Sequence, residues 1–465
     1  MGDLNGTKLE TLRGALRGGV VAPDDPGYDE ARSIYNAMID RRPSAVAKCV
    51  DAADVRTVLA FAHEEGVELA VQGGGHSGPG LGMIDGALTL DLSAMNWARV
   101  DPAAGIAQVG GGSQLGTLDH AGHTFGLGIP SGIMSTTGIG GLTLGGGHGH
   151  LTRKYGLTID SLLSADVVLA DGTFVTASAD NHPDLFWALR GGGGNFGVVT
   201  SFAFRMHPVS NVGVGLTVWP VERTQDVLRW YREFLPTAPE DLSGFFAVLA
   251  VPPGPPFPEP IHGQKMCAVV WCYTGDLEEG HLEEVLSVVN EPAPPAFHFS
   301  APMPYPALQS MFDGLIPKGL QWYWRGDFFD EISDAAIEVH ERYGSALATD
   351  SSTMHLYPVD GAAHRVGADD TAWAYRDAVW SAVIGGIDPE PANADTIRQW
   401  CVDYWNDLHP HSMGGSYINF LGEEEGPERV RSTYRGHYDR LASIKRTYDP
   451  ENFFRSNQNI PPSEG

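Results

Sequence analysis

Val71-Gln72-Gly73-Gly74-Gly75-His76-Ser77 is the stretch that decides the fold of this chain. Three consecutive glycines let backbone N–H groups approach a pyrophosphate, which any side chain would obstruct. Residues 67–71 alternate like a strand, so the glycines form a strand-to-loop turn with His76 at its tip. An imidazole in that place can be covalently loaded with a cofactor, and the alternative is a hydrogen-bonded histidine in a tight bend.

Two further glycine-rich runs extend this pattern, at residues 110–149 and 190–200. Glycine weakens regular elements, so this density requires a bound ligand, disorder or repeats. Ile139, Leu142 and Leu144 are interleaved with the glycines, which disfavours disorder. Neither common nucleotide motif fits, because no G-x-x-x-x-G-K-[ST] occurs and residues 73–80 do not open an apolar helix followed by an acid about twenty residues on.

Several separated motifs run along nearly the whole chain. They are Gly74-Gly75-His76-Ser77, Gly138-Ile139-Gly140-Gly141 with Gly145-Gly146-Gly147, residues 184–200, Tyr417-Ile418-Asn419-Phe420 and residues 448–460. In this order they resemble the covalent flavoproteins of the vanillyl-alcohol oxidase fold, in the branch of berberine-bridge-enzyme-like oxidases and 6-hydroxy-D-nicotine oxidase. The resemblance implies an α+β fold, with a bipartite FAD-binding domain and a substrate domain in which helices back an antiparallel sheet.

The same resemblance implies FAD, attached through its 8α-methyl group to His76. It also implies that the glycine loops and the C-terminal segment surround the cofactor. The residues expected there are Gly73, Gly74, Gly75, Ser77, Thr136, Gly138, Gly140, Gly141, Leu142, Gly146, Gly147, Gly149, Gly197, Val198, Asn419, Asn457 and Asn459.

The chain departs from the family pattern at one position. Many members hold the flavin a second time through a cysteine just before the Gly-x-Gly-Gly run, and here the matching residue is Met134. A thioether cannot replace a thiolate nucleophile, so we expect a single covalent bond. The four cysteines, Cys49, Cys267, Cys272 and Cys401, have no metal-binding spacing and are interpreted as small buried hydrophobes.

Composition restricts the partners. The 465 residues carry a formal net charge of −28 without a basic tract, which disfavours nucleic acid and membrane surfaces. No run of 18 apolar residues occurs, and the first residues lack the basic and apolar pattern of a leader peptide, so we expect none. We therefore expect a cytoplasmic monomer or homodimer that meets only a small-molecule substrate and O2. A scarcity of lysine accounts for the charge, so the charge need not reflect function.

Patterning divides the chain into three parts. Up to residue 208, strands alternate with amphipathic helices such as residues 54–65, which predicts the first part of the FAD domain. Residues 209–408 mix apolar strands, such as 244–250 and 266–273, with helices at 277–289, 333–343 and 394–408, and are assigned to substrate binding. The resemblance assigns residues 409–465 to a C-terminal return to the FAD domain. A proline-rich stretch at 251–256 is either a lid or a surface hairpin.

Tyr417 is the first candidate for the catalytic base, because relatives place there a tyrosine that helps deprotonate a substrate hydroxyl. Alternation along Ser416-Tyr417-Ile418-Asn419-Phe420 predicts that Tyr417 and Asn419 share one face of a strand. A free phenol titrates near 10, so base action requires a lowered pKa or concerted proton loss. His355, which shares a predicted strand face with Tyr357, is the alternative base. Tyr417 could instead merely pack over the flavin.

Aromatic residues are expected to line the substrate pocket, although ordinary core positions are the alternative. The pocket candidates are His148, Tyr357, Trp322 and Trp324, with Trp373 and Tyr375 as further wall residues. His148 and His150 flank Gly149 without a third ligand of defined spacing, so no metal site is predicted. The resemblance also places Thr137 where relatives control access of oxygen to the flavin, unless its hydroxyl serves only to satisfy backbone groups.

The predicted reaction is an FAD-dependent oxidation. A small alcohol, amine or natural-product intermediate would give hydride to the flavin, and O2 would accept the electrons and yield H2O2. Four alternatives stay open: a flavin oxygenase acting on a polyketide-type substrate, an oxygen-poor flavin dehydrogenase, a carbohydrate oxidase, and a binding protein with an inert flavin.

Overall fold

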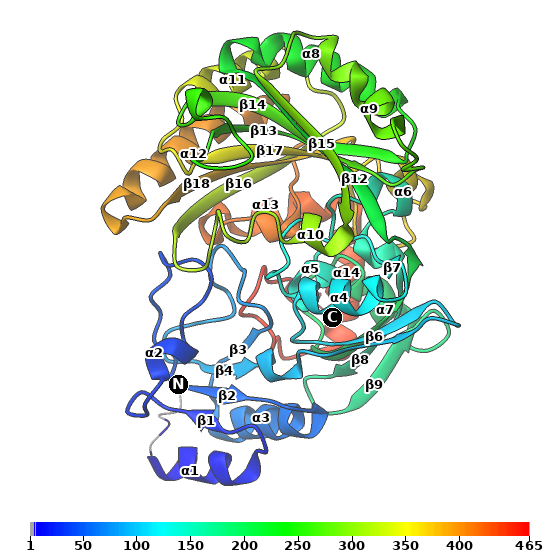
Figure 1. The fold of residues 1–465 in the computed structure, drawn as a ribbon. Helices are drawn as coiled ribbons and strands as arrows, with labels where there is room; N and C mark the ends of the chain where they lie inside the picture. Colours follow the sequence, from blue (N-terminus) through cyan, green and yellow to red (C-terminus); the bar gives the residue numbers. More distant parts are fainter. Residues whose placement is uncertain (1–3, 5, 465) are drawn as a thin grey trace.

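A small, mainly parallel sheet presents the first glycine loop. The computed structural model describes Leu4 and residues 6–464 (Figure 1). In this sheet the strand order is β1-β2-β4-β3, and β1 alone pairs antiparallel. Helix α3 begins after Asp51, whose carboxylate accepts hydrogen bonds from two N–H groups, and ends at Gly66 in the left-handed conformation. The bounds are β1 (Val20–Val21), β2 (Ala45–Lys48), β3 (Leu69–Gln72), β4 (Leu88–Asp91), α1 (Gly6–Ala15), α2 (Tyr28–Ala31) and α3 (Ala52–Glu65).

An antiparallel sheet of five strands carries the other two glycine loops. Its strand order is β5-β6-β10-β8-β9, and a separate pair joins β11 to β7. The bounds are β5 (Ala98–Asp101), β6 (Ile106–Gly110), β7 (Leu127–Gly128), β8 (Leu162–Val168), β9 (Phe174–Ser178), β10 (Val198–Arg205) and β11 (His207–Pro208), with helices α4 (Leu115–His123), α5 (Ile139–Leu144), α6 (Thr152–Tyr155) and α7 (Pro183–Leu189).

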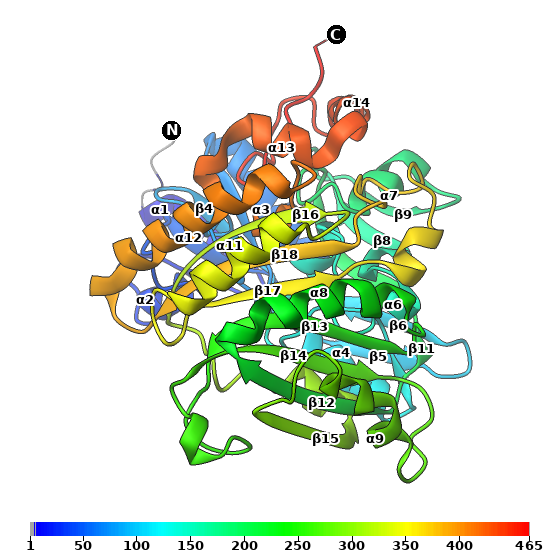
Figure 2. The ribbon, with the colours of Figure 1, turned by 90° about the horizontal axis from the view of Figure 1, so that it is seen from above.

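A seven-stranded antiparallel sheet forms the opposite half of the molecule, in the order β15-β12-β14-β13-β17-β18-β16. Helices α8, α9, α11 and α12 lie on its outer face, and Figure 2 looks down onto them. The bounds are β12 (Asn211–Pro220), β13 (Leu242–Ala250), β14 (Lys265–Tyr273), β15 (Phe297–Pro304), β16 (Gln321–Phe329), β17 (Thr353–Pro358), β18 (Trp380–Asp388), α8 (Thr224–Phe234), α9 (His281–Leu286), α10 (Tyr305–Gln309), α11 (Asp334–Ser345) and α12 (Ala394–Leu408).

The C-terminal segment packs back onto the five-stranded sheet. Val430 and Tyr434 of α13 (Gly426–Tyr434), with Leu441 of α14 (Tyr438–Tyr448), share one hydrophobic core with Trp187 and Phe202. The architecture is therefore the predicted mixture of an FAD-type α+β half and a large antiparallel sheet backed by helices. The boundaries at residues 208 and 408 stay predictions.

Two local predictions differ from the structure. The helix predicted at 277–289 begins only at His281, and residues 287–290 form a 3₁₀ turn. The strand predicted at 416–420 is wrong, because Ile418–Phe420 form a 3₁₀ turn in which the Phe420 N–H donates to the Tyr417 carbonyl at 2.8 Å. Alternation over five residues is too short to distinguish a strand from a turn whose ends are held by other elements.

Candidate active site

One cavity of about 400 Å³ lies between the glycine loops and the strands β16, β17 and β18. Most of the predicted site residues line it. They are Gly73, Gly74, Gly75, His76, Ser77, Thr137, Gly138, Gly140, Gly141, Leu142, His148, Gly197, Val198, Trp322, Trp324, His355, Tyr357, Tyr417, Asn419 and Asn457. Among the described residues of this wall, none is Asp, Glu, Lys or Arg.

The first two glycine loops touch backbone to backbone. A Cβ added to Gly74 would lie 2.4 Å from the amide nitrogen of Gly138, and a Cβ added to Gly138 would lie 2.4 Å from that of Gly74. A Cβ on Gly141, in contrast, would meet no atom within 4 Å, although Gly141 lines the cavity. Glycine thus serves protein packing at the first two positions and leaves room for a ligand at the third.

The loops offer the donors that a pyrophosphate needs. Within the described part of the chain, no hydrogen-bond acceptor is found for the backbone N–H groups of residues 73–77. The buried amide oxygens of Gln72 and Asn457, which also line the cavity, lack partners there too, and they can accept hydrogen bonds from donor groups of a cofactor. Because the wall is uncharged, an anion in this cavity would be held by N–H dipoles rather than by lysine or arginine. The residues that line this cavity are therefore chemically suited to bind FAD.

Five predicted cofactor residues do not line the cavity: Thr136, Gly146, Gly147, Gly149 and Asn459. The three glycines pack against protein instead. A Cβ on Gly146 would lie 2.2 Å from the Trp373 ring, and a Cβ on Gly149 would lie 2.1 Å from the Ser131 carbonyl oxygen. Close contacts with the rest of the protein therefore explain why these three residues are glycines, and no ligand is needed to explain them.

His76 stacks on Tyr35, with ring centroids 4.0 Å apart. Burial lowers the pKa of His76 to about 4, against an opposing hydrogen bond with the Thr136 backbone, so the imidazole is neutral at pH 7. A neutral imidazole keeps the nitrogen lone pair that a covalent bond requires. Sequence patterns did not identify Tyr35, because it lies in an irregular segment far from the glycine motif.

Met134 also lines the cavity, and the Tyr35 hydroxyl lies 3.8 Å from its sulfur. The four cysteines are buried and free, as predicted. Burial raises the pKa of each of these thiols, so none is poised as a thiolate.

Tyr417 is 4% exposed, and its hydroxyl is surrounded by hydrogen-bonding groups. The phenol oxygen accepts from Asn419 Nδ2 at 2.7 Å and from the Gly147 N–H at 3.2 Å, and the hydroxyl donates to the Leu142 carbonyl at 3.3 Å. Burial raises the pKa of Tyr417, although the bonds from Asn419 and Gly147 oppose this shift. The resting phenol is therefore neutral, and of the two routes considered from the sequence only concerted proton loss is compatible with this environment.

A second acid–base pair lies on β17. His355 Nδ1 and the Tyr357 hydroxyl are 2.6 Å apart. Burial lowers the pKa of His355 to about 4 and raises the pKa of Tyr357, so both groups are neutral at pH 7. His148 lies between Tyr357 and Tyr417, with ring centroids at 5.1 and 4.7 Å, and burial lowers its pKa to about 3.

The aromatic wall is smaller than predicted. Trp322 and Trp324 line the cavity with ring centroids 5.8 Å apart. Trp373 and Tyr375 do not, because Trp373 covers Gly146 and Tyr375 stacks on Phe328 at 4.8 Å.

The described residues include no group of three or more His, Cys, Asp or Glu that could hold a metal ion. They also include no helix long and apolar enough to cross a membrane.

Comparisons with known proteins agree with this geometry. Residues 43–178 match the FAD binding domain family, and residues 416–461 match the berberine and berberine-like family. An FAD-linked oxidoreductase of Dictyostelium discoideum is 32% identical over 92% of this chain and 91% of its own length. The structure of 6-hydroxy-D-nicotine oxidase from Arthrobacter nicotinovorans superposes with a TM-score of 0.84 at 26% identity, covering 96% of this chain and 98% of that one.

The fold has a further close match in Physcomitrella patens BBE-like 1, with a TM-score of 0.87 at 24% identity, covering 98% of this chain and all of that one. Together with the cavity and its glycine loops, these similarities establish the family. The chain belongs to the FAD-binding, berberine-bridge-enzyme-like family and is an FAD-linked oxidoreductase.

Proposed function

We propose that this oxidoreductase is an oxidase that removes hydride from a small, uncharged alcohol, amine or natural-product intermediate and uses O2 as its electron acceptor. The observation that carries the proposal is the arrangement of the cavity. The glycine loops form one part of the cavity wall, and the N–H groups of residues 73–77 have no acceptor among the described residues. Tyr417, His355 and His148 line the same cavity and are uncharged proton acceptors.

We further propose that FAD is attached through His76 alone. The neutral imidazole in the cavity wall and the thioether of Met134 support this attachment. The denatured protein should keep yellow, fluorescent flavin after acid precipitation, and His76→Ala should release it. Loss of all flavin from the denatured wild type, or recovery of a 6-S-cysteinyl adduct, would refute the single bond.

Bound FAD supplies the two-electron acceptor of the reaction and delivers the electrons to oxygen. The residues of the chain handle the proton. In a concerted transfer, the substrate proton would pass to the Tyr417 oxygen while the Tyr417 proton passes to a second base. Neutral His148 is the base that the wall offers, because its ring centroid lies 4.7 Å from that of Tyr417 and its nitrogens lack partners among the described residues. The N–H groups of Asn419 and Gly147 would stabilise the partial negative charge on the phenol oxygen while its own proton leaves.

The β17 pair is the alternative proton acceptor. If Tyr357 takes the substrate proton, its own proton passes to His355 Nδ1 over the existing 2.6 Å contact. The resulting imidazolium would be buried, where a cation is costly, so this route requires that the proton leave His355 quickly.

The wall supports an uncharged and partly aromatic substrate. Trp322 and Trp324 provide apolar faces, and both buried indole N–H groups lack partners among the described residues, so each could donate to one acceptor atom of a ligand. A long oligosaccharide would need many more polar partners than this wall offers.

The test is anaerobic mixing of the loaded protein with a panel of alcohols, amines, aromatic natural products and sugars, followed by air. An oxidase substrate should bleach the visible flavin absorbance, and air should restore it with one H2O2 per turnover. Incorporation of labelled oxygen into product would indicate an oxygenase instead. Slow recovery in air would indicate a dehydrogenase.

A further inference from the structure

Residues 414–422 carry Tyr417, Asn419 and Phe420 into the cavity wall. Within this segment the only regular element is the 3₁₀ turn Ile418–Phe420, so few of its own hydrogen bonds define its shape. A tyrosine that must meet a substrate proton needs a fixed backbone. The contacts that fix this segment therefore come from elsewhere.

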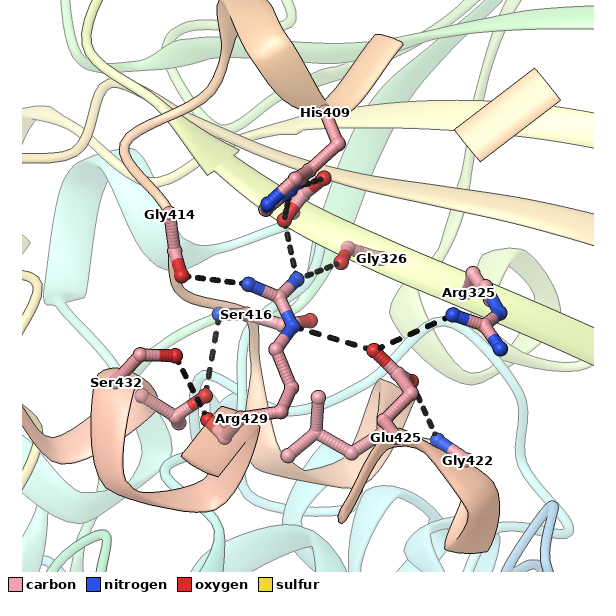
Figure 3. Close-up of polar contacts among 12 residues, drawn as sticks. Arg325, Gly326, His409, Gly414, Ser416, Gly422, Glu425, Arg429 and Ser432 are labelled. Carbon is pink, nitrogen blue, oxygen red and sulfur yellow. Dashed lines mark hydrogen bonds and ion pairs between the residues drawn. The ribbon is translucent and has the colours of Figure 1, made fainter. Parts of the chain in front are cut away.

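Arg429 of α13 and its neighbour Glu425 hold both ends of the segment (Figure 3). At one end, Arg429 Nη1 donates to the Gly414 carbonyl at 2.6 Å. At the other end, the Gly422 N–H donates to Glu425 Oε1 at 2.7 Å, while Arg429 Nε donates to Glu425 Oε2 at 3.2 Å. One guanidinium thus reaches both ends, directly and through one carboxylate.

The same guanidinium is anchored to the large sheet. Arg429 Nη2 donates to the Gly326 carbonyl of β16 at 2.9 Å and also bonds Asp327, whose carboxylate contacts His409 Nδ1 at 3.0 Å. Asp327 is 1% exposed, and the Arg429 guanidinium lies over the Trp405 ring of α12 at 5.4 Å. Removing one partner of an ion pair buried this deeply strongly destabilises the protein, because the other charge is left without its partner.

We propose that Arg429 is a positioning residue for Tyr417: it fixes residues 414–422 against β16 and so sets the place of the Tyr417 hydroxyl in the cavity wall. Arg429 does not itself line the cavity. The inference rests on the proposed function only in that it takes Tyr417 as the proton acceptor. A lysine cannot replace this residue, because an ammonium lacks the planar fork of donors that serves four acceptors in fixed directions.

Two side chains link the segment to the second glycine loop. The Tyr417 hydroxyl bonds the Gly147 N–H and the Leu142 carbonyl, and Asn419 Nδ2 donates to the Gly141 carbonyl at 3.1 Å. When the ends of the segment are released, we expect these three bonds to loosen. The amides of Gly147 and Gly422 are therefore reporters of the proposed role.

The first measurement needs no substrate. In Arg429→Met, hydrogen exchange in peptides covering residues 143–150 and 413–423 should be at least tenfold faster, while β13 and β14 keep wild-type rates. Arg153→Met is the matched control, because Arg153 is also buried and bonds Asp360 and the Leu242 carbonyl, neither of which lines the cavity. It should leave the peptide covering residues 413–423 unchanged, whereas residues 143–150 adjoin its own helix α6 and are not used for this control.

The second measurement is a double-mutant cycle on the rate of anaerobic flavin bleaching. Arg429→Met should slow bleaching at least tenfold at saturating substrate in the wild-type background, and should have no further effect when Tyr417 is already phenylalanine. Arg429→Lys should not rescue the rate. Glu425→Gln, which keeps an oxygen acceptor for the Gly422 N–H, should be milder than Glu425→Ala.

Three outcomes would overturn the proposal: unchanged exchange in the two peptides, faster exchange spread over the whole protein, or fully additive losses in the cycle. If Arg429→Met does not fold, Arg429→Lys and Glu425→Gln undergo the same two measurements. If no substrate bleaches the wild-type flavin, the proposed oxidase function fails, and the exchange data alone decide the role of Arg429.

Discussion

Asp119 provides a quantitative test of the packing beside the cavity. It lies on α4, is 3% exposed, and accepts one hydrogen bond, from Gln309 Nε2 of α10 at 3.4 Å. Gln309 Nε2 also donates at 3.0 Å to Ser131, which precedes the cavity-lining Gly132. Burial raises the pKa of Asp119 from its usual 3.8 to about 7. A carboxylate in this place is poorly compensated, and Asp119→Asn keeps its shape without its charge.

The sign and size follow from linkage. Because the folded pKa is raised, the contribution of Asp119 to stability is fully present below its usual pKa and is lost as the pH rises through the folded value. A shift of about three units at about 1.4 kcal/mol per unit costs the wild type about 4 kcal/mol at pH 8. At pH 5, which lies about 1.2 units above the usual pKa, only about 1.6 kcal/mol of that cost is in effect.

The Asp119→Asn variant should escape this cost. With an unfolding entropy of about 2.1 cal/mol/K per residue, a chain of this length loses about 1 kcal/mol of stability per degree near its Tm. The substitution should therefore raise the Tm by about 4 °C at pH 8 and by about 2 °C at pH 5.

The assay is thermal unfolding by circular dichroism at both pH values, with equal ionic strength and equal flavin content. Comparing wild type with variant at each pH cancels the titration of the other groups. The exposed Asp180→Asn is the control and should change the Tm little at either pH. An Asp119→Asn shift that is the same at pH 5 and pH 8, or a loss of Tm at pH 8, would refute the reasoning.

Two further predictions concern the chemistry. Tyr417→Phe should slow anaerobic flavin bleaching by about 10² or more, with little change in reoxidation by oxygen; an unaltered bleaching rate would transfer the role to His355 and Tyr357. Thr137 lines the cavity, and its hydroxyl makes no hydrogen bond within the described part of the chain. Thr137→Leu should slow reoxidation at least tenfold, or by about 1.4 kcal/mol of barrier. Stopped-flow mixing of the reduced protein with oxygen measures this rate, and equal rates would remove Thr137 from the mechanism.

Most residues that the sequence assigned to the cofactor line the cavity, because glycine is a local signal of close approach. Gly74 and Gly138 illustrate this, since each excludes a Cβ where the other loop passes. The same signal misled at Gly146 and Gly149, because glycine density has two causes. A side chain can be excluded by a ligand or by another part of the protein, and the sequence alone does not distinguish them.

The residues that support the site from a distance could not be predicted in this way. Tyr35 meets His76, and Arg429 meets Gly326, across long separations in sequence that leave no periodic pattern. The strand predicted from the short alternation at residues 416–420 was wrong for a related reason. Contacts at the ends of this segment, such as the bond from Arg429 to the Gly414 carbonyl, determine its backbone conformation more than its own propensity does. The long helix α12, with its apolar stripe, was predicted with its bounds.

The cavity wall draws on segments from Ile34 to Gln458, and its defining contacts join residues hundreds of positions apart. Such a wall has no precursor in any single piece of the chain, because each of its contacts must close a long loop before it forms. We therefore expect flavin to bind only to molecules in which those loops have closed, so that the yellow colour of a preparation sets a lower limit on its folded fraction.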